Sequence, residues 1–440
     1  MVVLKTLFGL LAITFLTCVS SAADEIETLN SSTFPTTNQG LVESLDWLPE
    51  FTSKTVGGLT TMKVDNLRSY DTHILIGSVP LVDPSDPQGS MNSIIGILPA
   101  MCYQVEDNFI QATPYTWTGA YRHNKADYFS KSVHFDKSIE IDALEITRSY
   151  SSSETDYSFF RVSIPNQLIV NEFSIQSSDR YYQYGQYHGD RLWYKSGIKL
   201  HNIELGAETY NDQSETGKSS LSDPYIRLET ENISLRASPY NRWIKGSLFG
   251  FFGKLGRSER QPSSYERYAS VDFGWGDYLL GNDKLTPETL YSQEWGYKGE
   301  LSGFKFLVST ALYQVENQIL FGQLHYENSD DTYKSRTYKL QAEKGPFKAD
   351  IRFLQDEDRV DSPNFKASLR WKSEKVIFGY TYVDTMKVVD ETSECLDWEL
   401  RYGKKPIEQR VFIEVPLGNM SLRSEVSTNG TFDLMIKDFF

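Results

Sequence analysis

The sequence predicts an all-β protein, and within that class a transmembrane antiparallel β-barrel of about 14–18 strands, a size inside the known range of such barrels. Two observations lead to this prediction. Segments of about 8–10 residues alternate between apolar and charged side chains, as membrane barrel strands do. Beyond residue 23, no apolar run is long enough for a membrane-spanning helix, so a closed barrel is the structure by which this chain can cross a bilayer.

The alternation is clearest in the second half of the chain. Phe347 to Phe353 alternates apolar residues with Lys, Asp and Arg, and Phe365 to Lys372 alternates them with Lys, Ser and Arg. Leu396 to Tyr402 repeats the pattern with Asp, Glu and Arg, and Val376 to Tyr382 follows it less strictly. Because side chains alternate between the two faces of a strand, each stretch has one apolar face and one polar face.

Turn sequences join these stretches into hairpins. Compact turns are expected at Lys344-Gly345-Pro346, Lys372-Ser373-Glu374, Gly403-Lys404-Lys405 and Thr428-Asn429-Gly430. Upstream, Ile226 to Arg236 and Glu294 to Gln314 are predicted as further hairpins, the second with its turn at Ser302-Gly303.

The position of the compact turns conflicts with the usual layout of a bacterial barrel. Such barrels end in the periplasm and have short periplasmic turns and longer outer loops. Counting strands back from Phe440 places the compact turns on the outer side instead. Either a strand near Pro416 to Ser421 is missing from this count, or the outer loops are unusually short.

Three regions follow from the order of these signals. Residues 1–23 are predicted as a secretory signal peptide, with Lys5, the apolar run Leu7 to Val19 and small residues before Ala23. Residues 24–64 carry little pattern and are expected to form an N-terminal extension or a plug inside the barrel. Residues 65–440 are assigned to the barrel itself.

One apolar stretch needs a separate explanation. Trp243 to Leu255 is the longest apolar candidate beyond the signal peptide, and it contains Gly246, Gly250 and Gly253. Glycine at this density disfavours a helix, so the stretch is predicted as a bent strand.

Composition excludes one class of partner. The chain has 59 acidic and 44 basic residues and a formal charge of −15 at pH 7. Nucleic-acid binding needs clustered Lys and Arg, so no nucleic-acid partner is expected. The aromatic content of 14% suits the aromatic girdles of a membrane barrel, but carbohydrate-binding β-proteins are aromatic-rich too.

The last ten residues form an amphipathic strand that ends on an aromatic residue. Phe432, Leu434 and Ile436 fall on one face, and Phe440 follows on the same face. A chain that stops on such a strand resembles the Gram-negative outer-membrane β-barrel proteins. The resemblance implies that these four residues are the signal read by the outer-membrane assembly machinery, and that the protein contacts outer-membrane lipid.

No catalytic, metal-binding or cofactor-binding motif emerges. The six histidines show no metal-ligand spacing, and there is no H-E-x-x-H, phosphate loop or G-x-S-x-G sequence. We therefore expect no enzyme activity, no cofactor and no metal. Cys102 and Cys395, the two cysteines outside the signal peptide, are either one disulfide or two free thiols.

The charged strand faces are the best candidates for function. A charged face must point to water, because Arg or Lys facing lipid at mid-depth costs about 2–4 kcal/mol. The side chains expected to line a pore and to filter solutes by charge are Lys348, Arg352, Arg370, Lys372, Asp397, Glu399 and Arg401.

A run of tyrosines is the other notable feature. Tyr181 to His188 contains four tyrosines, which are interpreted as an interfacial girdle or an outer loop. Stacking of these rings against sugars is the alternative.

The sequence thus predicts an outer-membrane barrel that acts as a passive, porin-like channel for small hydrophilic solutes. One alternative is an exported soluble β-sheet protein, such as a carbohydrate-active enzyme or a sugar-binding module. Another is a barrel that serves as a structural or adhesive surface protein. The oligomeric state and the solute are left open.

Overall fold

The computed structural model describes most of the chain beyond residue 50. The described residues are 51–56, 59–64, 73–85, 102–106, 109–113, 119–123, 126–135, 139–150, 153–165, 168–182, 185–214, 217–268, 270–272, 278–322, 325–356, 365–373, 375–384, 407–417, 420–428 and 432–438. The predicted signal peptide lies outside them. No helix in these ranges is long and apolar enough to cross a membrane.

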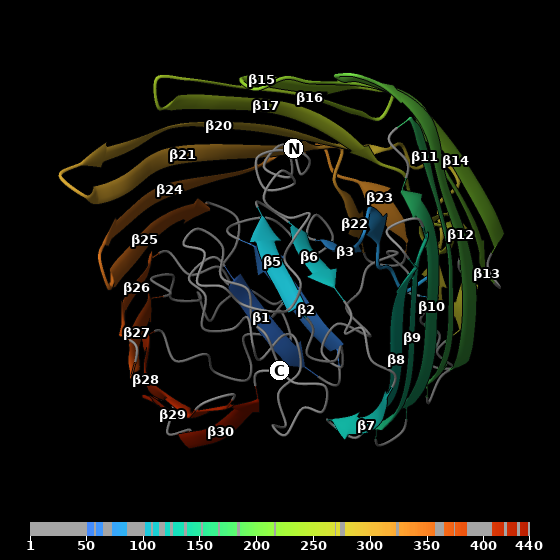
Figure 1. Ribbon diagram of the computed structural model, residues 1–440. Helices are drawn as coiled ribbons and strands as arrows, with labels where there is room; N and C mark the ends of the chain where they lie inside the picture. The colour runs from blue at the N-terminus through green and yellow to red at the C-terminus, as the bar shows by residue number, and fades with distance from the viewer. Residues whose placement is uncertain are drawn as a thin grey trace.

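A single closed antiparallel barrel dominates the fold (Figure 1). Its strands in the described ranges are β7 (Gly119–His123), β8 (Ala126–Phe135), β9 (Ile139–Tyr150), β10 (Ser153–Pro165), β11 (Ile169–Tyr182), β12 (Gly185–Leu200), β13 (Ile203–Ser214), β14 (Gly217–Glu229), β15 (Ile233–Ala237), β16 (Asn241–Leu248), β17 (Phe251–Arg260), β20 (Glu288–Leu301), β21 (Phe304–Glu316), β24 (Tyr333–Lys344), β25 (Phe347–Asp356), β26 (Phe365–Lys372), β27 (Ile377–Asp384), β28 (Ile407–Leu417), β29 (Met420–Ser427) and β30 (Phe432–Asp438). The last strand lies next to the first and closes the ring. The predicted fold class is confirmed, and a sandwich of two sheets is excluded.

The barrel is larger than the sequence suggested. The described residues contribute twenty strands, against the expected 14–18.

Burial in the barrel is inverted relative to a soluble protein. Apolar side chains on the outer face are exposed: Ile198 is 56% exposed and Leu205 is 50% exposed. Charged side chains on the inner face are buried: Arg161 is only 5% exposed and Lys254 only 2% exposed. A sheet that exposes its apolar face and encloses its polar face suits a lipid exterior and a polar interior.

The connections between strands differ at the two ends of the barrel. At the end where β30 finishes, short turns join β12 to β13, β16 to β17, β20 to β21 and β24 to β25. At the opposite end, long connections join β17 to β20, β21 to β24 and β27 to β28. We call these the short-turn end and the long-loop end.

This layout resolves the conflict over turn positions in part. Pro416 pairs with Ser421 across a hairpin between β28 and β29, so a strand had been missed at that point. With the extra strand, the turns near Gly345 and Ser373 fall at the short-turn end together with the end of β30. The connection from β29 to β30, at Thr428 to Gly430, falls at the long-loop end, and Gly403 to Lys405 lie outside the described residues.

The apolar stretch from Trp243 to Leu255 forms a hairpin, which corrects the predicted single bent strand. Leu248 pairs with Phe251 across a turn made by Phe249 and Gly250. Both turn residues have positive φ, 51° and 84°. Glycine therefore permits a tight reversal here where the sequence analysis expected only a bend.

The segment before the barrel forms a separate small sheet. It contains β3 (His73–Ile76), β4 (Val79–Pro80), β5 (Cys102–Glu106) and β6 (Phe109–Thr113) in the order β4-β3-β6-β5. A further hairpin pairs β1 (Phe51–Val56) with β2 (Leu59–Val64). Figure 1 looks into the ring of strands and shows β1, β2, β3, β5 and β6 within it. The first described barrel strand is β7, and β3, β4, β5 and β6 belong to the small sheet.

Two of the long connections carry structure of their own. The connection from β17 to β20 contains α3 (Ser264–Tyr268), β18 (Ser270–Asp272) and β19 (Tyr278–Leu280). The connection from β21 to β24 contains β22 (Ile319–Phe321) and β23 (Tyr326–Asn328). Leu280 bridges to His325, so the two connections touch each other.

Candidate functional site: the strap on the barrel wall

Residues 77–85, which we call the strap, lie along the inner face of β11. The Ser78 amide donates to Glu172 at 3.2 Å, and the Val82 amide donates to Gln176 at 2.9 Å. The hydroxyls of Ser85 and Ser178 are 3.2 Å apart. The sequence separations are 94, 94 and 93, so strap and strand run in the same direction. The strap therefore follows β11 from the short-turn end toward the long-loop end.

Gln176 holds the middle of the strap. Its side chain is fully buried, and its Oε1 accepts from the Val82 amide at 2.9 Å and from the Tyr157 hydroxyl at 3.0 Å. Its Nε2 donates to the Pro80 carbonyl at 3.1 Å. One side-chain amide thus satisfies an N–H and a C=O of the strap backbone, as a neighbouring strand would.

Arg161 holds the start of the strap through a cluster of carboxylates. Its guanidinium donates to Asp142 at 2.5 Å, to Glu140 at 3.0 Å and to Glu172. The Ser78 hydroxyl donates to the same Glu172. Arg161, Asp142 and Glu172 are all buried, so this is a desolvated ion cluster that one cation holds together.

Gly77 explains how closely the strap approaches this cluster. A Cβ at this position would overlap the Arg161 guanidinium, and the φ of 64° is unfavourable for other residues. On the barrel side, a Cβ at Gly189 would overlap the Pro84 carbonyl. Each partner therefore presents a glycine where the other approaches.

The far end of the strap is linked to the long-loop end. Asp83 is fully buried and pairs with Arg180 at 3.5 Å. The Arg180 guanidinium lies 5.9 Å from the ring centre of Tyr187. The ring centres of Tyr187 and Tyr265 of α3 are 6.1 Å apart, and those of Tyr265 and Tyr326 of β23 are 6.4 Å apart. A line of direct contacts therefore runs from the strap to both long connections.

Tyr265 lies in the long connection, beyond the barrel strands. Burial raises its pKa above the ordinary tyrosine value, and the neighbouring phenols of Tyr187 and Tyr326 act in the same direction. Tyr265 is therefore held in its neutral form where it packs against Tyr187 and Tyr326.

The two long connections are fastened to the barrel and to each other. Arg260, at the end of β17, pairs with Glu266 of α3 at 3.0 Å and with Glu288 at 2.7 Å. Glu288 also accepts from the Ile319 amide at 2.6 Å. The Asn282 side chain donates to the Tyr326 carbonyl at 2.9 Å. We call the described residues of these two connections, within 261–287 and 317–332, the outer cover.

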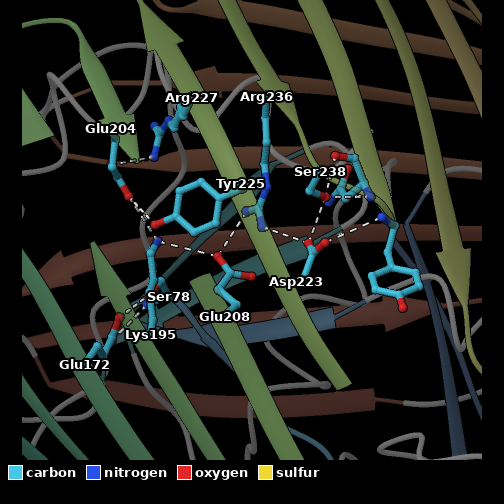
Figure 2. A network of polar contacts seen from close by, with 12 residues as sticks. Ser78, Glu172, Lys195, Glu204, Glu208, Asp223, Tyr225, Arg227, Arg236 and Ser238 are labelled. Atoms are coloured by element: carbon cyan, nitrogen blue, oxygen red, sulfur yellow. Dashed lines mark hydrogen bonds and ion pairs between the residues drawn. The ribbon is translucent and has the colours of Figure 1, made fainter. Parts of the chain in front are cut away.

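Next to the strap, the inner wall carries a network of paired charges across β12 to β15 (Figure 2). Arg236 pairs with Glu208 at 3.0 Å and with Asp223 at 3.3 Å. Lys195 lies 3.7 Å from Glu208 and 3.9 Å from Glu204. Each of these bases has a carboxylate on a neighbouring strand, so the charges of this wall are balanced locally.

The predicted pore-lining residues lie on a different part of the ring. Lys348 and Arg352 are on β25, and Arg370 and Lys372 are on β26. The apolar neighbours Ile351 and Leu369 are exposed on the outer face, which places these bases on the inner face. Arg352 pairs with Asp350 at 2.9 Å. Asp397, Glu399 and Arg401 lie outside the described residues. That these side chains line a pore stays a prediction.

The predicted assembly signal is described only in part. Phe432, at the start of β30, is 65% exposed, in line with an outer-face position. Leu434 and Ile436 belong to β30, whereas Phe440 lies outside the described residues. Cys395 also lies outside them, so the pairing of the two cysteines is untested. Among the described residues, no group of His, Cys, Asp or Glu could hold a metal ion.

Sequence reasoning missed the strap and its partners on β11. A signal was present, because Glu172, Ser174, Gln176, Ser178 and Arg180 form a polar face opposite Phe173 and Ile175. This face was not connected to residues 77–85, since a separation of 94 residues leaves no periodicity to detect. The tyrosine run was noticed, but its inward member, Tyr187, contacts the outer cover and Arg180.

Comparison with known proteins gives structural likeness without sequence likeness. No protein-family model and no curated protein sequence matches the chain. The structure resembles the siderophore receptor PirA from Acinetobacter baumannii, with a TM-score of 0.60 and 9% identity over 91% of this chain and 93% of that one. It resembles a ferric enterobactin receptor (PfeA) mutant from Pseudomonas aeruginosa, with a TM-score of 0.61 and 9% identity over 93% of each chain.

A third neighbour is the hemophore receptor HasR of Serratia marcescens, solved with its hemophore and heme. Its TM-score is 0.56, with 10% identity over 91% of this chain and 96% of that one. The likeness to these three structures confirms the β-barrel fold that the sequence predicts. At 9–10% identity it shows the fold alone.

Proposed function

We propose that this chain is a gated outer-membrane receptor for uptake, rather than an open porin. The observation that carries the proposal is the strap, which fastens the small N-terminal sheet to the inner wall by buried polar contacts. A segment docked inside the ring opposes the passive channel expected from the sequence. Residues 24–113 then act as a plug, and residues 24–64 are its first part.

The structural neighbours support the same proposal. They belong to the TonB-dependent receptors, and the ones named above are described as receptors for a siderophore, for ferric enterobactin and for a hemophore. By analogy, the cargo here is a scarce nutrient complex larger than the small hydrophilic solutes of a porin. The analogy rests on fold alone, so the identity of the cargo is open.

The charge of the cargo is proposed from β25 and β26. Among the described side chains of these two strands, bases outnumber acids on the inner face: Lys348, Arg352, Lys366, Arg370 and Lys372 stand against the single acid Asp350. An excess of positive charge along a passage favours anions. We therefore propose that the passage opens along this wall and that it favours an anionic solute.

The test compares sugar entry into liposomes for the full chain and for a chain lacking residues 24–113. The proposal expects the full chain to admit no more sugar than empty liposomes, and the shortened chain to admit it rapidly. Equal rapid entry through both chains would instead support the passive porin. Folding of each chain is checked first by heat-dependent migration on a gel.

A further inference from the structure

The turn between β16 and β17 departs from the chemistry of a two-residue hairpin turn. Phe249 and Gly250 have φ of 51° and 84°, a combination that normally takes Asn-Gly or Asp-Gly. A bulky aromatic residue with positive φ is strained. Phe249 is also 87% exposed, and its neighbours Leu248 and Phe251 are 63% and 65% exposed. Local turn preference does not explain a phenylalanine here.

The turn between β12 and β13 is a natural comparison. It also reverses in two residues, and His201 has a similar φ of 53°. Its residues, His201 and Asn202, are polar, as expected for a turn in water. Both turns lie at the short-turn end, which is the periplasmic end of such barrels. Two turns at the same end of the barrel therefore differ in chemistry, with an aromatic residue in one and polar residues in the other.

The two hairpins also differ in the length of their outer apolar face. On β12, Asp190 is the last outward charge before the turn, and ten residues separate it from Leu200. On β16, the outward Arg242 lies opposite Arg257, and only six residues separate it from Leu248. At about 3.3 Å per residue and the usual strand tilt, these distances span about 25 Å and about 15 Å of membrane depth.

A lipid-facing band is about 25 Å tall, so β16 and β17 are too short to carry their turn through it. Moving Arg242 or Arg257 into the lipid-facing band would cost free energy, because a charged side chain would then face lipid. The end of the hairpin that carries these arginines therefore stays at the edge of the band. The turn at the lower end is then left within the leaflet. Aromatic rings continue the apolar surface to this point, since Phe251 packs on Tyr297 at 4.7 Å and Tyr297 on Phe306 at 5.8 Å.

We propose that the β16–β17 turn is inserted in the periplasmic leaflet and that Phe249 anchors it there among phospholipids. Continuity with the outer apolar face selects lipid as the occupant, because Leu248 and Phe251 belong to that face. In Figure 1 the tips of β16–β17 and of the neighbouring β20–β21 project from the ring of strands. The anchor would set the depth of this side of the barrel, whatever the cargo is.

The first test measures which medium surrounds the turn. A spin label is placed at Phe249→Cys in the full chain, with the other cysteines replaced by serine, and the protein is reconstituted in phospholipid vesicles. Collisions with oxygen, which concentrates in lipid, should exceed collisions with a water-soluble nickel chelate. The same label at His201→Cys should show the opposite order. Preferential contact with the nickel chelate at position 249, or poor access to both reagents, would overturn the proposal.

The second test separates anchoring from turn chemistry. Phe249→Asn creates the favoured Asn-Gly turn, so in water it would leave stability unchanged or raise it. In lipid vesicles, we expect Phe249→Asn to lower the folding equilibrium constant by about tenfold or more. This loss corresponds to the free energy gained when a phenylalanine side chain is removed from water. Phe249→Trp should keep the parent value, and His201→Asn should change little. A neutral or stabilising Phe249→Asn in vesicles would contradict the anchor.

Discussion

The inner surface of the barrel has two walls that organise charge differently. On the wall from β9 to β15, carboxylates stand beside the bases Arg161, Arg180, Lys195 and Arg236, and the strap is fastened there. On β25 and β26, the described inner face carries more bases than acids, and Arg352 pairs with Asp350. Buried charges that hold two parts of a fold together need close partners, because an isolated buried charge is costly. An excess of one sign suits a surface that meets water or a charged solute.

The contrast assigns a different role to each wall. The balanced wall binds the strap, and under the proposed function it holds the plug while the basic wall forms the passage. The outer cover reaches the balanced wall through Tyr187 and Arg180, so an event at the mouth has direct contacts leading to the strap.

The largest effect is expected from Arg161→Ala. It leaves Glu140, Asp142 and Glu172 facing one another without their cation, which costs about 3–5 kcal/mol for a buried ion cluster. The strap should detach, and ion conductance across a planar bilayer should appear. Arg352→Ala, which removes a buried arginine from the basic wall, should leave the barrel closed.

A disulfide can show that such conductance comes from the strap. The hydroxyls of Ser85 and Ser178 are 3.2 Å apart, so cysteines at both positions can bridge strap and wall. In a background without Cys102 and Cys395, oxidation should close the Arg161→Ala channel, and reduction should reopen it. The matched control is a disulfide between cysteines at positions 209 and 222 on β13 and β14, where the hydroxyls of Thr209 and Ser222 are 3.1 Å apart. If both bridges act alike, the strap is not the gate.

A smaller effect is expected from Gln176→Leu. The Val82 amide and the Pro80 carbonyl lose their partner, at a cost of about 1–3 kcal/mol for a buried polar group left unsatisfied. Hydrogen exchange at the Val82 amide should quicken by about 5- to 150-fold, which is the same free-energy cost expressed as a ratio of rates. Tyr157→Phe, which removes only the third bond, should have less effect. An unchanged exchange rate at Val82 would show that Gln176 does not hold the strap.

The basic wall is tested by Arg370→Glu combined with Lys372→Glu in the Arg161→Ala background. Reversing two charges along the passage should shift permeability from anions toward cations by about fivefold, on the order of 1 kcal/mol for an ion passing at close range in water. The reversal potential under a salt gradient measures this shift. If selectivity stays the same, these two residues do not define the passage.

The smallest effect concerns the outer cover at alkaline pH. Because burial raises the pKa of Tyr265 in the folded state, its contribution to stability is complete below the ordinary tyrosine pKa of about 10 and declines above it. Limited proteolysis of residues 261–287 should therefore quicken as pH rises beyond that value. Tyr265→Phe should reduce this pH dependence without affecting the cover at neutral pH. Equal alkaline sensitivity in both proteins would contradict the role of Tyr265.

The sequence alone predicts much of the strand arrangement. The alternation in Phe347 to Phe353 and Phe365 to Lys372 reappears as β25 and β26, with the apolar residues outside. The turn at Ser302-Gly303 joins β20 to β21 as expected. These features are local, since strand period and turn geometry depend on residues only a few positions apart.

The chain alone determined that each strand would have one apolar face and one charged face, because the side-chain period of a strand is local. Only the folded structure decided that the interior is fastened to an N-terminal strap. Ser78 meets Glu172, and Val82 meets Gln176, across 94 residues of intervening chain. Such a pairing depends on how the ring closes around the segment, and a closed ring is a property of all its strands together.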